Sequence, residues 1–447
     1  MKISYIGLSG LLATQSSMDT SARNIANLLT PGYTRQGTVL ASRAAGGVDV
    51  ARLVRYEDRY KSQQLWNSTA REGVYAAMEP YFSQLEEVMG LEEGSVKGGI
   101  DAFFAALNEV STGPTSIPLR QQVLSAAEGL VTRFDALRDT LYGQLDAVRQ
   151  QAATSAAQVS DLSATVAALN ERIAELTAAG GVPSELIDQR DRALLELARL
   201  AEIRVAEQPD GMVDVTLAQG TPLVRGKLAA RAETVANADG TFGLKLSMGA
   251  AEFPLDATRA GGSIGGLAAY AGQVLLPQLE YTHTLAAELA GRINAALTSG
   301  YGTDGQPGQP LFLVDAATGR LSLNPAVDQV NLGFSSAPGE PGNTDNLAAL
   351  IDVRLQPFVL PGLGQVTVDD AYTIMVGKLG SDSQNNAASL ETAATLRSQA
   401  ELDLLSVTGV NSEEEAVRMS ELLQAYQANM KVISVANRIF DTLIEAF

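Results

Sequence analysis

The chain has 447 residues, a formal net charge of -19 at pH 7, 46% hydrophobic but only 5% aromatic residues, and no cysteine. Its length exceeds the usual size of one hydrophobic core, so we expect two or three domains. The acidic balance argues against nucleic acids and anionic membranes as partners, because both bind basic surfaces. Without cysteine, disulfides and thiolate metal sites are excluded.

Polar residues interrupt the apolar residues of the N-terminal segment, unlike the core of a cleaved signal peptide. No later stretch approaches the apolar length needed to span a bilayer. We therefore expect a protein that is cytosolic, or exported by a route that does not cleave a signal.

The first helix is predicted from about Ser4 until shortly before Pro31, since a Pro-Gly pair cannot continue a helix. Positions along it recur at alternating steps of three and four residues, the a and d spacing of a coiled coil. We call these positions the N-terminal seam: Leu8, Leu11, Gln15, Met18, Ala22, Ile25 and Leu29. A hairpin that turns at Gly46 and Gly47 and reaches about Arg55 is predicted to follow.

The longest regular pattern lies at residues 141–176, where the same spacing continues without a break. A helix of about forty residues would be roughly 60 Å long. Gly180, Gly181 and Pro183 end it, and Ser184 is suited to cap the next helix, so the region is predicted to be a helical hairpin.

Beyond residue 201 the pattern changes to the alternation typical of strands, with turns at Asp210-Gly211 and Asp239-Gly240. One more helical stretch is predicted at about 263–297, and helical sequence returns near residue 382. After a break at Gly409, Ser412 and Glu415 match a capping box.

This order predicts an α+β multidomain protein. An elongated helical bundle is formed by both ends of the chain, the terminal helices are coiled-coil-like, and a β-rich middle domain is inserted between them. We assign residues 1–35 with 412–447 to a terminal domain, 36–200 with 380–411 to the bundle, and 201–379 to the β-rich domain.

The last helix carries a C-terminal seam: Met419, Leu423, Tyr426, Met430, Ile433, Asn437, Phe440, Ile444 and Phe447. One interpretation is that both seams form the core of an ordinary intramolecular bundle. The other is that neighbouring molecules cover them, because one antiparallel pair would leave much apolar surface exposed. A pairing with Leu29 opposite Leu423 brings Gln15 opposite Asn437, and such a buried polar pair would fix the register.

One motif suggests an enzyme. Gly261 to Gly265 fit the G-x-S-x-G pattern around a nucleophilic Ser263, and the base would have to be His283, the only histidine. If the segment is helical, these residues lie roughly 30 Å apart, far beyond the reach of a base. A glycine-rich helix start is therefore the preferred interpretation, and a secreted hydrolase is the alternative. We expect no cofactor and no metal, since Asp304 lacks the alternating carboxylates of a calcium loop.

The segment from Gly10 to Gln36, with NIAN at 24–27 and GYTRQ at 32–36, resembles the N-terminal signature of bacterial flagellar axial proteins. The signature residues are Asn24, Ile25, Ala26, Asn27, Gly32 and Tyr33. GYTRQ followed by GGVDVARLVR, together with residues 169–200 and 406–447, resembles in particular the hook-associated proteins of the hook–filament junction. A hook or distal rod protein is the nearest alternative, although those proteins share only the terminal motifs. A coiled-coil adhesin is another.

The resemblance implies a structural protein that leaves the cell through the flagellar type III export channel without a cleaved signal. It implies assembly as a ring at the distal end of the hook, with terminal helices lining an inner tube beside those of neighbouring subunits. The implied partners are other copies of the chain, the hook protein, a second junction protein, the flagellin filament and an export chaperone. The compact middle region leaves open whether a third, outermost domain exists.

Overall fold

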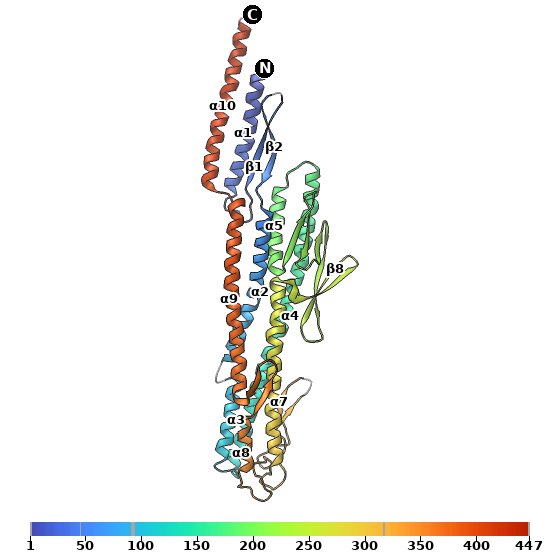
Figure 1. The fold of residues 1–447 in the computed structure, drawn as a ribbon, viewed down its shortest axis with the longest axis vertical. Helices are drawn as coiled ribbons and strands as arrows, with labels where there is room; N and C mark the ends of the chain where they lie inside the picture. Colours follow the sequence, from blue (N-terminus) through green and yellow to red (C-terminus); the bar gives the residue numbers. More distant parts are fainter. Residues whose placement is uncertain (1, 45, 91–93, 316–317, 446–447) are drawn as a thin grey trace.

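The computed structural model describes residues 2–44, 46–90, 94–315 and 318–445. The molecule is elongated, and both chain ends lie at the same end of its long axis (Figure 1). Long helices dominate, and the strands form small antiparallel sheets. The predicted fold class, an elongated helical bundle built from both ends of the chain with β structure inserted between them, is confirmed.

The terminal end consists of an antiparallel helix pair and a β-hairpin beside it. The predicted hairpin is confirmed, but the first helix ends at Ala26, before the predicted boundary. The chain then turns through residues 27–32, where Gly32 has a φ of 72° that favours glycine. The elements are α1 (Lys2–Ala26), β1 (Gln36–Ser42), β2 (Val48–Arg55) and α10 (Ser412–Glu445).

Long helices lie side by side in the bundle, with α2 packed on α9 and α3 packed on α4 (Figure 1). The bounds are α2 (Arg59–Gly90), α3 (Val96–Val110), α4 (Ile117–Ala178), α5 (Ser184–Leu200) and α9 (Val368–Thr408). α4 is one continuous helix of 62 residues, about 90 Å long. It exceeds the predicted forty residues because buried positions such as Val123, Leu130 and Leu137 extend its inner face upstream of the regular pattern at 141–176.

The predicted helical hairpin is formed by α4 and α5, which pack along each other. Gly180, with a φ of 79°, lies in the turn. The prediction that Ser184 caps α5 is wrong, because Pro183 occupies the cap position and Ser184 is the buried first residue of the helix.

The inserted strands lie between residues 203 and 256 and form two antiparallel sheets. The predicted turns are confirmed, and Gly211 and Gly240 both have positive φ angles there. The order β3-β4-β5-β6 makes one sheet, and β7-β8-β9 makes the other. Their bounds are β3 (Ile203–Glu207), β4 (Val213–Leu217), β5 (Pro222–Arg225), β6 (Leu228–Ala229), β7 (Arg231–Ala236), β8 (Phe242–Met248) and β9 (Ala251–Asp256).

The helical stretch predicted within the β-rich region lies along the bundle. α6 (Gly262–Tyr270) packs on α2, and α7 (Leu276–Ser299) packs on α4, with the π-helical turn η2 (Ala271–Leu275) between them. The remaining short elements are η1 (Ala257–Ala260), β10 (Phe312–Val314), β11 (Leu321–Leu323), α8 (Asp345–Asp352), η3 (Val353–Leu355), β12 (Pro357–Leu360) and β13 (Gly364–Thr367). α9 begins at Val368, earlier than the predicted return near residue 382.

The hydrophobic core runs along the bundle and includes Phe103 from α3, Leu141 from α4 and Tyr270 from α6. Within the described ranges, this core contains residues from α2 through α9 and from the sheets, but none from α1 or α10. The terminal helices are therefore held mainly by each other and by the hairpin.

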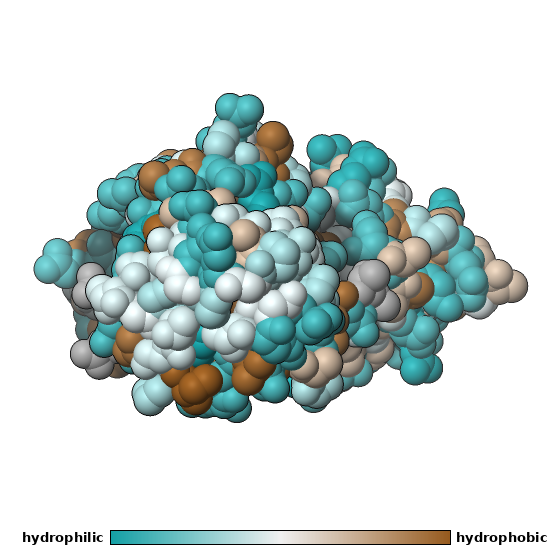
Figure 2. Space-filling view, turned by 90° about the horizontal axis from the view of Figure 1, so that it is seen from below, coloured by the Kyte–Doolittle hydropathy of each residue, from teal (hydrophilic) through white to brown (hydrophobic). Residues whose placement is uncertain are grey.

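The end of the molecule opposite the termini has a mainly hydrophilic surface (Figure 2). Figure 2 looks at it from below, and hydrophilic and neutral residues prevail, with hydrophobic residues in small separate groups. Across the part of the chain that the structure describes, no helix is both long and apolar enough to cross a membrane.

Candidate assembly interface

Small residues line the face on which α1 meets α10. A Cβ atom placed on Gly10 would lie 2.5 Å from Oδ1 of Asn429, and one on Gly7 would lie 2.9 Å from Cγ1 of Ile433. The helices can approach this closely only because these side chains are absent. The buried residues of α1 are Gly7, Ser9, Gly10, Ala13, Thr14, Ser17, Thr20, Ser21 and Asn24.

A buried carboxylate anchors the start of α10 on α1. Glu415 is 1% exposed. It accepts a hydrogen bond from Ser21 Oγ at 2.5 Å and another from Asn24 Nδ2 at 3.0 Å. The predicted capping box is therefore wrong. Asn411 Oδ1 caps the helix instead by accepting from the backbone amides of the residues at 413 and 414.

Asn24, the first residue of the NIAN signature, is 1% exposed and uses its whole hydrogen-bonding capacity. Its Oδ1 accepts from the Gln36 backbone amide at 3.0 Å and from the Tyr33 hydroxyl at 2.9 Å. Its Nδ2 donates to the Gln36 carbonyl at 2.9 Å as well as to Glu415. Burial of the Tyr33 ring raises its pKa, and the nearby negative charges of Asp188 and Glu415 add to this effect. The Asn24 side chain therefore connects α1, β1 and α10.

The other signature residues divide into two groups. A Cβ on Gly32 would lie 2.8 Å from the side chain of Arg192, and Asn27 accepts a hydrogen bond from Thr30 within the turn. These residues shape the turn after α1. Ile25 and Ala26 are exposed.

The observed register of the pair differs from the register that the seams predicted. Gly10 lies beside Asn429, and Ser21 beside Glu415. Counted from the Gly10 contact, Gln15 and Asn437 lie about 20 Å apart along the helices, and both are exposed. The predicted pairing of these two residues is wrong, because the closest packing uses small and polar residues that an apolar pattern does not detect.

The structure does not bring the two seams together. In the N-terminal seam, Leu8, Gln15, Ala22, Ile25 and Leu29 are exposed, while Leu11 and Met18 are half-buried. In the C-terminal seam, Leu423, Met430, Asn437, Phe440 and Ile444 are exposed, while Met419, Tyr426 and Ile433 are half-buried. Phe447 lies outside the described residues. Most seam positions therefore face away from the contact between α1 and α10.

Further apolar side chains extend the exposed faces of both helices. On α1 they are Ile3, Tyr5, Ile6 and Leu12, and on α10 they are Val417, Val432, Val435 and Ile439. The end of α10 also projects beyond α1 (Figure 1). The terminal pair thus presents a substantial apolar surface to its surroundings.

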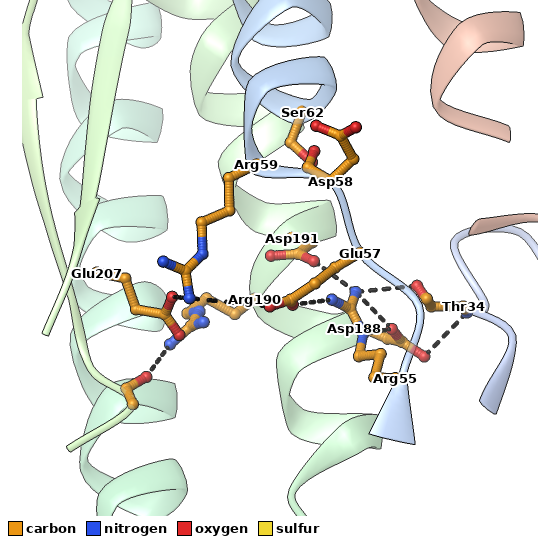
Figure 3. Close-up of polar contacts among 11 residues, drawn as sticks. Thr34, Arg55, Glu57, Asp58, Arg59, Ser62, Asp188, Arg190, Asp191 and Glu207 are labelled. Carbon is orange, nitrogen blue, oxygen red and sulfur yellow. Dashed lines mark hydrogen bonds and ion pairs between the residues drawn. The ribbon is translucent and has the colours of Figure 1, made fainter. Parts of the chain in front are cut away.

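A second polar cluster fixes the terminal end to the bundle (Figure 3). Arg55, at the end of β2, donates to Asp188 at 2.9 Å and to Asp191 at 2.6 Å, both on α5. It also donates to the Thr34 hydroxyl at 2.9 Å and to Glu57 at 3.1 Å. We call these five residues the Arg55 cluster. The sequence pattern did not reveal the Arg55 cluster, because its members come from two segments that are far apart in the chain.

The structure does not support the hydrolase alternative. Ser263 lies at the start of α6 and His283 is exposed on α7, so a nearly continuous helix separates them by roughly 30 Å. The glycines have a packing reason. A Cβ on Gly262 would lie 2.4 Å from the Ala201 backbone nitrogen, and one on Gly266 would lie 2.1 Å from the Val74 carbonyl oxygen. Among the described residues, no group of histidine, aspartate and glutamate side chains could hold a metal ion.

Comparison with protein families decides what kind of protein this is. The model of the flagellar hook-associated protein FlgK helical domain matches residues 82–312, more than half of the chain. The chain belongs to the FlgK family. A model of the flagellar basal body rod FlgEFG protein C-terminal region also matches residues 404–446, which include all of α10.

Full-length relatives agree with this assignment. Flagellar hook-associated protein 1 of Salmonella typhimurium is 26% identical, and the alignment covers 98% of both chains. The protein of the same name from Bacillus subtilis is 23% identical, with 99% of this chain and 98% of the relative covered. Among solved structures, the flagellar hook junction protein FlgK from Burkholderia pseudomallei is 26% identical with a TM-score of 0.54, covering 57% of this chain and 47% of that one.

As a FlgK protein, the chain is a hook–filament junction protein of the flagellum, a structural component and not an enzyme. The alignment with the Salmonella typhimurium relative spans 544 positions, whereas this chain has 447 residues. The relative therefore contains segments that this FlgK chain lacks.

Proposed function

We propose that this chain closes a ring at the distal end of the hook, in which the seams of α1 and α10 pack against the terminal helices of neighbouring copies. The observation that carries the proposal is that the fold leaves these apolar positions uncovered. Leu423, Met430 and Phe440 are between 44% and 51% exposed. Contiguous apolar surface of this kind is typical of a protein–protein contact.

The projecting end of α10 supports the same proposal. Near the end of α10, Ile439 and Ile444 are 48% and 60% exposed. A helix end in water frays unless something holds it. In a ring, the neighbouring terminal pair covers this end.

Membership in the family also guides the choice of partners and location. We infer contacts with the hook protein on one side and with a second junction protein, and through it the flagellin filament, on the other. The protein reaches this extracellular site through the type III export channel without a cleaved signal. An export chaperone covers the exposed face of α10 before export, because an amphipathic helix is a natural ligand for an apolar groove.

The domain division fits the same arrangement. Residues 1–35 with 412–447 form the inner tube, and residues 36–200 with 380–411 form the bundle. Residues 201–379 form the outer part of the wall, where the sheets at 203–256 provide the β structure. The position of the terminal pair outside the main hydrophobic core supports its separation from the bundle.

Assembly is coupled to folding of the terminal helices. Because α1 and α10 contribute nothing to the main core within the described residues, tertiary packing stabilises them weakly in the monomer. They are partly disordered and competent for export before docking, and they become ordered beside their neighbours.

Removal of residues 440–447 tests this function. The truncated chain loses ring insertion and filament attachment, while the bundle keeps its thermal unfolding transition. Arg438→Ala is the matched control, because it changes an exposed polar residue of the same helix and leaves the seam intact. Filament growth supported by the truncated chain would show that the C-terminal seam is not the assembly element.

A further inference from the structure

α10 contains two overlapping faces that could pack on α1. The observed inner face is largely half-buried and includes Leu422, Tyr426, Asn429, Ile433 and Ala436. The C-terminal seam shares Tyr426 and Ile433 with this face but has Leu423 and Met430 where the inner face has Leu422 and Asn429. A turn of α10 about its axis by roughly half of the 100° between consecutive residues would therefore bring Leu423 and Met430 onto α1. Hydrophobic burial alone would favour the seam.

Glu415 opposes this rotation. Its carboxylate is buried, and its hydrogen bonds come from Ser21 and Asn24 on α1. A rotation of α10 would carry the carboxylate away from both donors. A buried carboxylate without partners is strongly unfavourable, so the observed face is retained despite its lower apolar content.

The donor side of this contact is itself held in place. Three of the four hydrogen bonds of the Asn24 amide go to Tyr33 and to the Gln36 backbone. These bonds orient the amide so that its remaining N–H points to Glu415. The turn after α1 therefore determines where the carboxylate of α10 must lie.

We propose that Glu415 is a positioning residue for assembly: its contacts with Ser21 and Asn24 hold α10 in the rotation that keeps Leu423 and Met430 of the C-terminal seam facing outward, toward a second copy of this chain. This inference rests on the proposed function. It adds that the hydrogen bonds of Glu415 select between two overlapping faces of α10, so that Leu423 and Met430 remain free for the neighbour.

Disulfide reporters can measure the rotation in the monomer, because the chain has no cysteine of its own. Gly10→Cys with Asn429→Cys reports the observed face, since Cβ of residue 10 would lie 2.8 Å from the Asn429 Cγ position. Gly10→Cys with Met430→Cys reports the rotated face. In the unaltered background the first pair closes about tenfold faster than the second, because disulfides require closely spaced Cβ atoms.

Glu415→Leu is the decisive variant. It removes the polar constraint and reverses the preference, so that the pair containing Met430→Cys closes faster. Without the reporters, the Glu415→Leu chain keeps the thermal transition of the bundle but does not support filament attachment. Glu415→Gln retains an acceptor oxygen and restores both the original preference and attachment. Glu413→Leu is the matched control, because Glu413 is exposed on the same turn.

Each result has a defined meaning. An unchanged reporter preference in Glu415→Leu overturns the positioning role, whatever the truncation at residue 440 shows. A reversed preference with normal filament attachment also overturns it, because the presented face would then be irrelevant to assembly. If the chain truncated at residue 440 still supports filament growth while the reporters reverse as expected, the proposed function is rejected. The effect of Glu415 on the rotation of α10 is then retained.

Discussion

The guanidinium of Arg55 lies 2.9 Å from the carboxylate of Asp188, and this contact connects the end of β2 to α5. Both side chains are largely buried, at 11% and 6% exposure. The terminal hairpin and the bundle are separate parts of the fold. The contact therefore helps to fix the orientation of the hairpin relative to the bundle.

Arg55→Ala should destabilise this junction by about 3 kcal/mol, because removal of one partner leaves the buried carboxylate of Asp188 without its counter-charge. Chemical denaturation of the full chain measures the loss. Arg59→Ala is the matched control: its side chain is 73% exposed beside Glu207, and an exposed ion pair contributes less than about 1 kcal/mol. Equal effects of the two substitutions would show that the Arg55 cluster is not a structural junction.

Gly10→Ala should loosen the contact between α1 and α10. Its new Cβ would lie 2.5 Å from the Asn429 side chain, and overpacking of this kind costs about 1–3 kcal/mol. Hydrogen exchange of the buried amides of α1 measures the change, and the double variant Gly10→Ala/Asn429→Ala should recover protection.

Gly143→Ala in α4 is the control for helix propensity, because nothing lies within 4 Å of the added Cβ. That substitution should stabilise the chain by about 1 kcal/mol. If Gly10→Ala raised protection as Gly143→Ala does, the close approach at Gly10 would not be required.

Alkaline pH should weaken the bundle at the contact between α9 and α2. Burial raises the pKa of Tyr372 to about 12, and its hydroxyl donates to the Met89 carbonyl at 2.9 Å. An unfolded tyrosine ionises near pH 10. The contribution of the neutral hydroxyl is therefore complete below about pH 10 and is lost as the pH rises through about 12.

To isolate this group, the free energy of unfolding is measured for the unaltered chain and for Tyr372→Phe from about pH 9 to about pH 12. This range includes the pKa values of the unfolded and the folded tyrosine. The difference between the two proteins should shrink as the pH rises. A constant difference across that range would contradict the assigned pKa shift.

The terminal helices should exchange their amide hydrogens much faster in the monomer than the bundle core does, with only residual protection where α1 contacts α10. Ile25 and Ile433 are suitable probes because both lie in the terminal pair, outside the hydrophobic core of the bundle. Leu141, in that core, is the internal reference for slow exchange. Strong protection at Ile25 and Ile433 in the monomer would contradict folding coupled to assembly.

The regular spacing of apolar residues predicted much of the fold. Where the prediction was wrong, specific contacts between helices explain the difference. Leu145, Val148 and Val159 repeat at coiled-coil spacing and are buried in α4, so that helix was recognised from sequence. The pairing of α1 with α10 was predicted in the wrong register, because Gly10 and Glu415 carry no apolar signal. A close glycine contact and a buried carboxylate depend on the partner helix, which a one-dimensional pattern does not contain.

The candidate site was likewise predicted in part. The seam positions are the correct type of residue for an assembly surface, but their outward orientation could not be derived from spacing alone, since an a and d stripe also describes an intramolecular core. The signature residue Asn24 was recognised by resemblance. Its role became evident only from its contacts with Tyr33, Gln36 and Glu415.

Thiol labelling of Met430→Cys tests the central claim most directly, because the chain has no other cysteine and Met430 is 48% exposed in the C-terminal seam. Leu228→Cys, on β6 of the inserted sheet, is the reference position at 64% exposure. Met430→Cys should react rapidly in the monomer and become protected on hook ends that carry the protein, while Leu228→Cys reacts in both states. Equal labelling of Met430→Cys before and after assembly would contradict an interface built from this seam.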